Sequence, residues 1–113
     1  MNRIFVYGTL KRGQRNAHYM RDAQYVGRHV TEKIYSMYEF GGYPAVCRDG
    51  RHAISGEVYR VNDRHFGILD EFESYPDFYQ RIEIPTLWGD AWMYVVEYEL
   101  CSGKRKLFGN WPK

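Results

Sequence analysis

The sequence has little cysteine, little proline and no long apolar run. Its two cysteines, Cys47 and Cys101, lie far apart and in no metal-binding spacing, so we favour reduced structural thiols over a disulfide. The apolar run at residues 4–7 is too short for the core of a signal peptide. No stretch approaches the roughly 18 apolar residues that a membrane span needs. These absences predict a soluble, cytoplasmic protein without a membrane partner.

The sequence also has little excess of charge of either sign. The formal net charge is +2, which is too small to indicate binding to nucleic acid. The chain of 113 residues is long enough for one domain and too short for two, so we expect a single domain over residues 1–113. Aromatic residues are abundant at 18%, with 11 tyrosines. Tyrosine favours strands and half-buried pockets, because it combines apolar area with one polar group.

Hydrophobic patterning indicates many strands and one main helix. The helix is predicted at residues 63–73, with Asn62 or Asp63 as its N-cap. Gly56 lies inside a predicted strand and suggests a bulge or a close backbone approach. Strands are predicted at residues 4–7, 53–61, 79–87 and 91–99, with one or two more in 24–38 and one or two helical turns in 15–22. The class is therefore α+β, a small, mixed, largely antiparallel and barrel-like sheet with one main α-helix and short flanking helices.

Glu73 is the first candidate for chemistry. It lies at the negative end of the predicted helix dipole, and on a helical wheel it falls between the directions of Phe66 and Leu69, on the core side. Both features raise the pKa of a carboxyl group, as a general acid–base residue requires near neutral pH. Two plainer interpretations remain open. The acidic helix end is simply solvated, or Glu73 pairs with a cation such as Arg81.

The turn Tyr7-Gly8-Thr9-Leu10 is the second candidate. It leaves a buried strand through a glycine, and such a turn can aim consecutive backbone N–H groups at an anion. A strand that merely ends at a glycine is the plainer interpretation. A P-loop is excluded, because Gln14-Arg15 stands where lysine and serine or threonine are required. Residues 4–10 also look like the first motif of an RNA-recognition domain, but the second motif of that domain is absent.

The sequence offers no other pattern of catalytic or metal-binding residues. There is no Gly-x-Ser-x-Gly elbow, and neither cysteine has the context of a nucleophile. The histidines show no metal spacing such as His-x-x-x-His; they are His18, His29, His52 and His65. We therefore expect no cofactor and no metal.

Three runs of sequence together resemble the γ-glutamylcyclotransferase-like superfamily. They occur in the family's order and spacing and span roughly residues 3–99. They are Phe5-Val6-Tyr7-Gly8-Thr9-Leu10-Lys11-Arg12-Gly13, then Gly56-Glu57-Val58-Tyr59, and then Leu69-Asp70-Glu71-Phe72-Glu73-Ser74-Tyr75-Pro76 followed by Tyr79-Gln80-Arg81. The match is best with compact bacterial members and with γ-glutamylamine cyclotransferases. Ser74 departs from the pattern, since many members carry glycine there, although the γ-glutamylamine branch also tolerates serine.

The resemblance implies a small mixed barrel flanked by helices and an enzyme that converts a γ-glutamyl amide to 5-oxoproline and a free amine. It places the catalytic glutamate on Glu73 and the substrate-binding turn on Tyr7, Gly8, Thr9 and Leu10. The implied partner is a small γ-glutamyl substrate. The alternative is a non-catalytic member that binds a small carboxylate-containing metabolite. Tyr43 and Tyr79 are further candidates for the pocket wall, and residues 31–51 and the tail are expected to shape the side of the leaving amine. The sequence leaves the oligomeric state open.

Overall fold

The computed structural model describes residues 1–112 and contains eight strands, one α-helix and two short 3-10 helices within them. In chain order these are β1 (Asn2–Val6), η1 (Ala17–Met20), β2 (Gln24–Val30), β3 (Tyr35–Glu39), β4 (Pro44–His52), β5 (Ser55–Val61), α1 (Asp63–Phe72), β6 (Gln80–Ile84), β7 (Ala91–Val95), η2 (Tyr98–Cys101) and β8 (Arg105–Leu107). No helical segment within residues 1–112 has the length and apolar character needed to cross a membrane.

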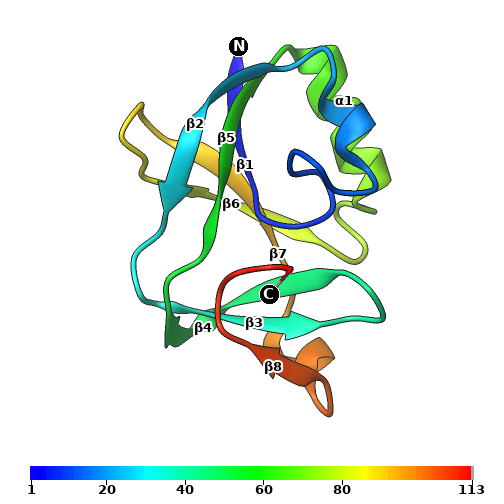
Figure 1. Cartoon of the computed structure of the whole chain (residues 1–113). Coiled ribbons are helices and arrows are strands. Elements are labelled where there is room, and N and C mark those ends of the chain that lie inside the picture. Colours follow the sequence, from blue (N-terminus) through cyan, green and yellow to red (C-terminus); the bar gives the residue numbers. More distant parts are fainter. Residues whose placement is uncertain (113) are drawn as a thin grey trace.

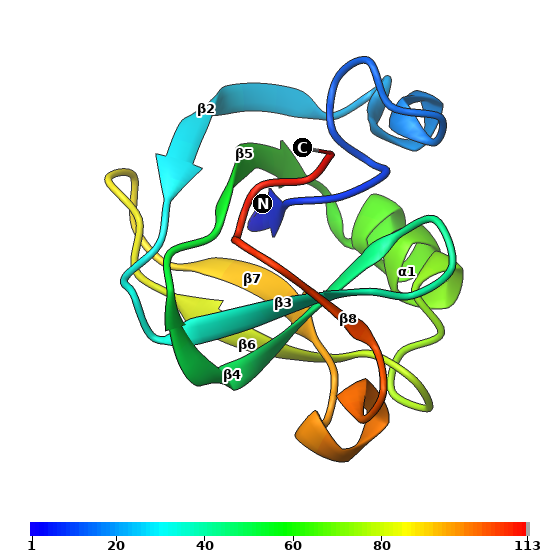
Figure 2. The same cartoon turned by 60° about the horizontal axis from the view of Figure 1, so that its bottom comes forward.

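The strands form two sheets that curve around a shared interior (Figures 1 and 2). The larger sheet has the order β2-β5-β1-β7-β6, and the smaller has the order β4-β3-β8. Strands β1 and β7 pair in parallel, whereas the other described pairs are antiparallel. The N–H of Val96 donates to the carbonyl of Val46 at 2.9 Å and so links the two sheets. The predicted α+β class is confirmed, with two curved sheets in place of one continuous barrel.

The main helix forms where the sequence predicts it. Asn62 is the N-cap, since its side-chain oxygen accepts a hydrogen bond of 2.7 Å from the N–H of His65. Phe66 and Leu69 are buried against the rest of the protein, and α1 packs beside β5 (Figure 1). The helix ends at Phe72, one residue earlier than predicted, so Glu73 is its C-cap.

Several strand boundaries differ from the prediction. The strands predicted at 79–87 and 91–99 are shorter, because the chain leaves the large sheet after Val95 to bond with β4 and then turns into η2. Strands β4 and β8 were not predicted. β4 begins at Pro44, which an edge strand accommodates at its first position because no ladder hydrogen bond is needed from the missing N–H.

Gly56 lies at a close backbone approach, as predicted. A Cβ atom there would lie 2.3 Å from the carbonyl oxygen of Val6 on the neighbouring strand and 2.8 Å from the ring of Phe5. Both neighbours belong to the buried core, so neither can move without disturbing the packing.

Replacing Gly56 by alanine should therefore lower the free energy of unfolding by about 1–3 kcal/mol, the usual cost of overpacking a core. Gly67→Ala is the matched control, because Gly67 is an exposed glycine in the middle of α1, and a Cβ atom added there would have no neighbour within 4 Å. That change should raise stability by up to about 1 kcal/mol through helix propensity. Urea unfolding followed by circular dichroism measures both. Equal effects of the two substitutions would contradict the steric argument.

Candidate active site

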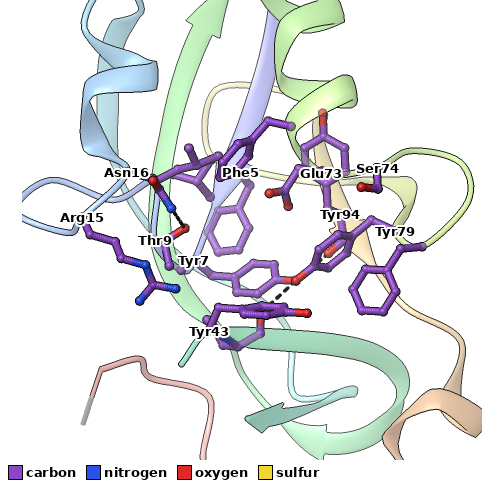
Figure 3. A pocket seen from close by; sticks show the side chains of 16 residues that line it. Phe5, Tyr7, Thr9, Arg15, Asn16, Tyr43, Glu73, Ser74, Tyr79 and Tyr94 are labelled. Carbon is purple, nitrogen blue, oxygen red and sulfur yellow. Dashed lines mark hydrogen bonds between the residues drawn. The ribbon is translucent and has the colours of Figure 1, made fainter. Parts of the chain in front are cut away.

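A cavity of about 250 Å³ opens where the turn after β1, the hairpin of β3 and β4, and the end of α1 meet. Figure 3 shows the side chains that face it. Its wall includes all four residues of the predicted turn, from Tyr7 to Leu10, and also Glu73. The structure thus brings together two sequence features that are more than sixty positions apart.

The Glu73 carboxylate points into this cavity (Figure 3). Its backbone N–H still donates to the carbonyl of Leu69 at 2.9 Å, which continues the helical hydrogen bonding by one residue. Ser74 then adopts a left-handed conformation with φ of 55° and turns the chain away. Burial at the cavity raises the pKa of Glu73 to about 8. The group therefore exchanges its proton near neutral pH.

Arg81 does not pair with Glu73. Its guanidinium forms two hydrogen bonds with the carboxylate of Asp70, at 3.0 and 3.1 Å. The Tyr94 hydroxyl donates to the same carboxylate at 2.7 Å. The interpretation that Glu73 forms an ion pair with Arg81 is therefore wrong, because Arg81 is bound by the neighbouring carboxylate of Asp70.

Aromatic rings hold Arg81 on that side of the helix. Its guanidinium carbon lies 4.4 Å from the ring centre of Phe66, 4.3 Å from that of Tyr75 and 4.8 Å from that of Trp92. Contacts of a guanidinium with ring faces are favourable and restrict its orientation. The position of the cation is thus fixed by packing as well as by charge.

The turn after β1 leaves consecutive backbone donors free. The N–H of Lys11 donates to the carbonyl of Gly8 at 3.1 Å and closes the turn. Within residues 1–112, no hydrogen bond is made by the N–H groups of Gly8, Thr9 and Leu10. A Cβ atom on Gly8 would lie 2.9 Å from Pro44, so glycine allows β4 to approach the turn. Such a set of donors suits an anionic group.

Buried tyrosine hydroxyls brace the cavity wall. The Tyr7 hydroxyl donates to the Tyr94 carbonyl at 2.8 Å and accepts from the N–H of Val46 at 3.3 Å. The Tyr79 hydroxyl donates to the Pro44 carbonyl at 3.0 Å. Burial, followed in each case by the effect of nearby charged groups including Glu73, raises the pKa of Tyr7 and Tyr79 well above the ordinary value. Both hydroxyls therefore stay protonated at neutral pH.

The remaining predictions for the wall have mixed outcomes. Tyr43 and Tyr79 line the cavity as expected, whereas no residue of the tail described from 102 to 112 does. Three residues that were not predicted also line it: Arg15, Asn16 and Tyr94. The alternation of β7 could have identified Tyr94, while the loop that carries the other two gives no comparable signal. No group of three or more potential metal-ligating side chains gathers within residues 1–112.

The sequence matches one known protein family over almost its whole length. The family model described as "Gamma-glutamyl cyclotransferase, AIG2-like" matches residues 4–113. The chain belongs to this family. It is 37% identical over 109 residues to the γ-glutamylcyclotransferase family protein YtfP of Escherichia coli strain K12, covering 96% of this chain and 95% of that protein. The expectation of a γ-glutamylcyclotransferase-like enzyme is thus confirmed.

One further relative and one solved structure support the assignment. The γ-glutamylaminecyclotransferase of Bos taurus is 42% identical over 90 residues, with 72% of this chain and 54% of that protein covered. The solution structure of protein ytfP from Escherichia coli has a TM-score of 0.79 and 36% identity, and the alignment covers 98% of this chain and 96% of that one. The left-handed Ser74 also gives a physical reason for glycine at this position of the family pattern.

The raised pKa of Glu73 should make stability depend on pH. Between pH of about 4.5 and about 8, Glu73 keeps its proton in the native state but loses it in the unfolded chain. The free energy of unfolding should therefore fall as pH rises through this window. Glu73→Gln removes the effect. The variant should be more stable than the wild-type protein at pH 8.5, and the difference should vanish towards pH 4.

Urea unfolding at a series of pH values measures this difference. Glu71→Gln is the matched control, since it removes the same formal charge at an exposed position of the same helix end. A pH dependence that is equal in the two variants would show that Glu73 is not specifically perturbed by burial.

Proposed function

We propose that this protein is a γ-glutamyl cyclotransferase that releases 5-oxoproline and a free amine from a γ-glutamyl amide, with Glu73 as general acid and base. The observation that carries the proposal is that the partly buried Glu73 carboxyl, which has no salt bridge within residues 1–112, lines the same cavity as the Gly8–Leu10 turn with its free N–H groups. Membership of the cyclotransferase family supports it.

The substrate supplies its own nucleophile in this reaction. The α-amine attacks the γ-carbonyl carbon and closes a five-membered ring, after which the bond from that carbon to the leaving nitrogen breaks. Attack within one molecule benefits from proximity once the substrate is held in a folded conformation. A covalent enzyme intermediate is therefore not required.

Proton transfer is what remains for the enzyme. The α-ammonium gives up two protons in forming the lactam, and the leaving nitrogen gains two to depart as an ammonium. Glu73 can pass them on one at a time, as base towards the α-nitrogen and then as acid towards the leaving nitrogen. A pKa of about 8 suits both directions, because neither protonation state is strongly favoured near neutral pH.

The turn is assigned to the anionic parts of the substrate. The three free N–H groups of Gly8, Thr9 and Leu10 can bind the α-carboxylate or the oxyanion that develops at the γ-carbonyl. Thr9 is held in place by the Asn16 side chain, whose amide donates to the threonine hydroxyl at 3.1 Å. This contact stiffens the turn, which favours preorganised binding.

Glu73→Gln should reduce kcat by roughly 10²–10⁴, the usual contribution of general acid–base catalysis, with little change in KM. The assay measures 5-oxoproline from a panel of γ-glutamyl amines and γ-glutamyl amino acids. Glu71→Gln is again the control and should keep its activity. Activity that survives in Glu73→Gln would rule out the mechanism. Binding without turnover of any compound would instead indicate a non-catalytic member of the family.

The pH profile should report the same group. Since Glu73 must be ionised to accept the proton of the α-ammonium, kcat/KM should rise with pH and level off above about 8. Steady-state kinetics between pH 5.5 and pH 9.5 measure this limb. A flat profile over this range would contradict the assignment, because a glutamate with its ordinary pKa of 4.5 is already ionised throughout it.

A further inference from the structure

Arg15 stands at the mouth of the cavity and has a defined position there. Its Nη1 donates to the carbonyl of Gly42 at 2.8 Å. Gly41 and Gly42 both have positive φ, 64° and 99°. These conformations favour glycine, and in this turn between β3 and β4 the Gly42 carbonyl accepts the hydrogen bond from Arg15. A guanidinium has five N–H donors, and this bond leaves others available to a ligand.

The charge of Arg15 is not neutralised by the protein. Among residues 1–112, no carboxylate lies within 4 Å of its guanidinium nitrogens. It is the one cationic side chain among the described residues that line the cavity, and Glu73 is the one acidic side chain. Because partial burial raises the pKa of Glu73 to about 8, this carboxyl is largely protonated at neutral pH, and the cavity carries a net positive charge at its mouth.

Arg15 also lies away from the reacting centre. Figure 3 shows it beyond Thr9, on the other side of the cavity from Glu73 and Ser74. It is exposed, so it meets a part of the ligand that extends towards solvent. In the proposed reaction, the α-amine and the γ-carbonyl lie next to Glu73. The Gly8–Leu10 turn binds the α-carboxylate or the developing oxyanion, both of which belong to the γ-glutamyl half of the substrate. The leaving group is the part that remains to reach the mouth.

The geometry points to Arg15 as a specificity-determining residue that binds a carboxylate on the leaving amine, so that γ-glutamyl conjugates with an anionic leaving group are preferred over neutral and cationic ones. This inference rests on the proposed function and refines it. The class of substrate is set by charge at the mouth, whereas Glu73 and the turn act on the γ-glutamyl half.

Two substrates of matched shape test the inference. γ-Glutamylalanine carries the carboxylate, and γ-glutamylalaninamide replaces it with a neutral amide. The wild-type protein should prefer the first in kcat/KM by roughly tenfold, which corresponds to a charged hydrogen bond at an exposed site. Arg15→Met should abolish this preference, and Arg15→Lys should retain part of it. Arg15→Glu should favour a γ-glutamyl diamine instead.

Arg12→Met is the matched control. Arg12 is exposed in the same loop but does not line the cavity, and its guanidinium lies over the Tyr25 ring at 4.0 Å. This variant should keep the preference of the wild-type protein. An equal loss of kcat/KM for both substrates in Arg15→Met would overturn the inference, because a merely structural contact with Gly42, or a contact with the α-carboxylate, affects both compounds alike.

A binding experiment separates this inference from the proposed reaction. In the Glu73→Gln background, calorimetry gives the Kd of each compound without turnover. A preference for γ-glutamylalanine that disappears in the double variant with Arg15→Met supports the inference even if no compound is consumed by the wild-type protein. Turnover of both compounds with no effect of Arg15 on their ratio would leave the proposed function standing and refute the role of Arg15.

Discussion

The site depends on which of two carboxylates at the end of α1 pairs with Arg81. Asp70 and Glu73 lie three positions apart, and Arg81 is bound by the first. The rings around the guanidinium hold it there, so it does not move to the second. An arginine beside Glu73 would favour the carboxylate and lower its pKa. Because Arg81 is engaged elsewhere, burial alone sets the proton affinity of Glu73. The acid–base character of the site thus begins with an interaction outside the cavity.

Two of the 11 tyrosines have a structural role in the same region. Tyr7 joins the end of β1 to β7 and β4 through its hydroxyl, and Tyr79 joins the start of β6 to β4. These hydroxyls form hydrogen bonds with backbone groups where the two sheets meet. Without them, those backbone groups would be left unpaired. They are fixed as hydrogen-bond donors with raised pKa values, so they frame the cavity without competing with Glu73 for its proton.

The sequence predicts best what local rules decide. The helix at 63–73 follows from the spacing of Phe66 and Leu69 and from the Asn62 cap, all within one segment, and the wheel correctly turns Glu73 inward. The choice of Arg81 between Asp70 and Glu73 could not be predicted, because the two carboxylates are neighbours at the helix end. Two of the three rings around the guanidinium, Tyr75 and Trp92, come from outside the helix. Strands β4 and β8 were missed for a similar reason, since pairing with distant partners forms them. Arg15 was missed because its position depends on a contact with Gly42, in a different loop.

An unpaired carboxyl in a small cavity can also respond to the charge of what binds. A buried carboxylate is costly, so the cavity by itself favours the protonated group. In the proposed reaction, an arriving α-ammonium stabilises the carboxylate and lowers the proton affinity of Glu73. Once that ammonium has lost its charge, the affinity rises again, and the proton is at hand for the leaving nitrogen. A permanent cation beside Glu73 would hold its pKa low throughout and weaken this alternation. Arg81 is bound to Asp70, and Arg15 lies at the far side of the cavity. Both permanent positive charges are therefore kept away from Glu73, whose protonation state must change during the reaction.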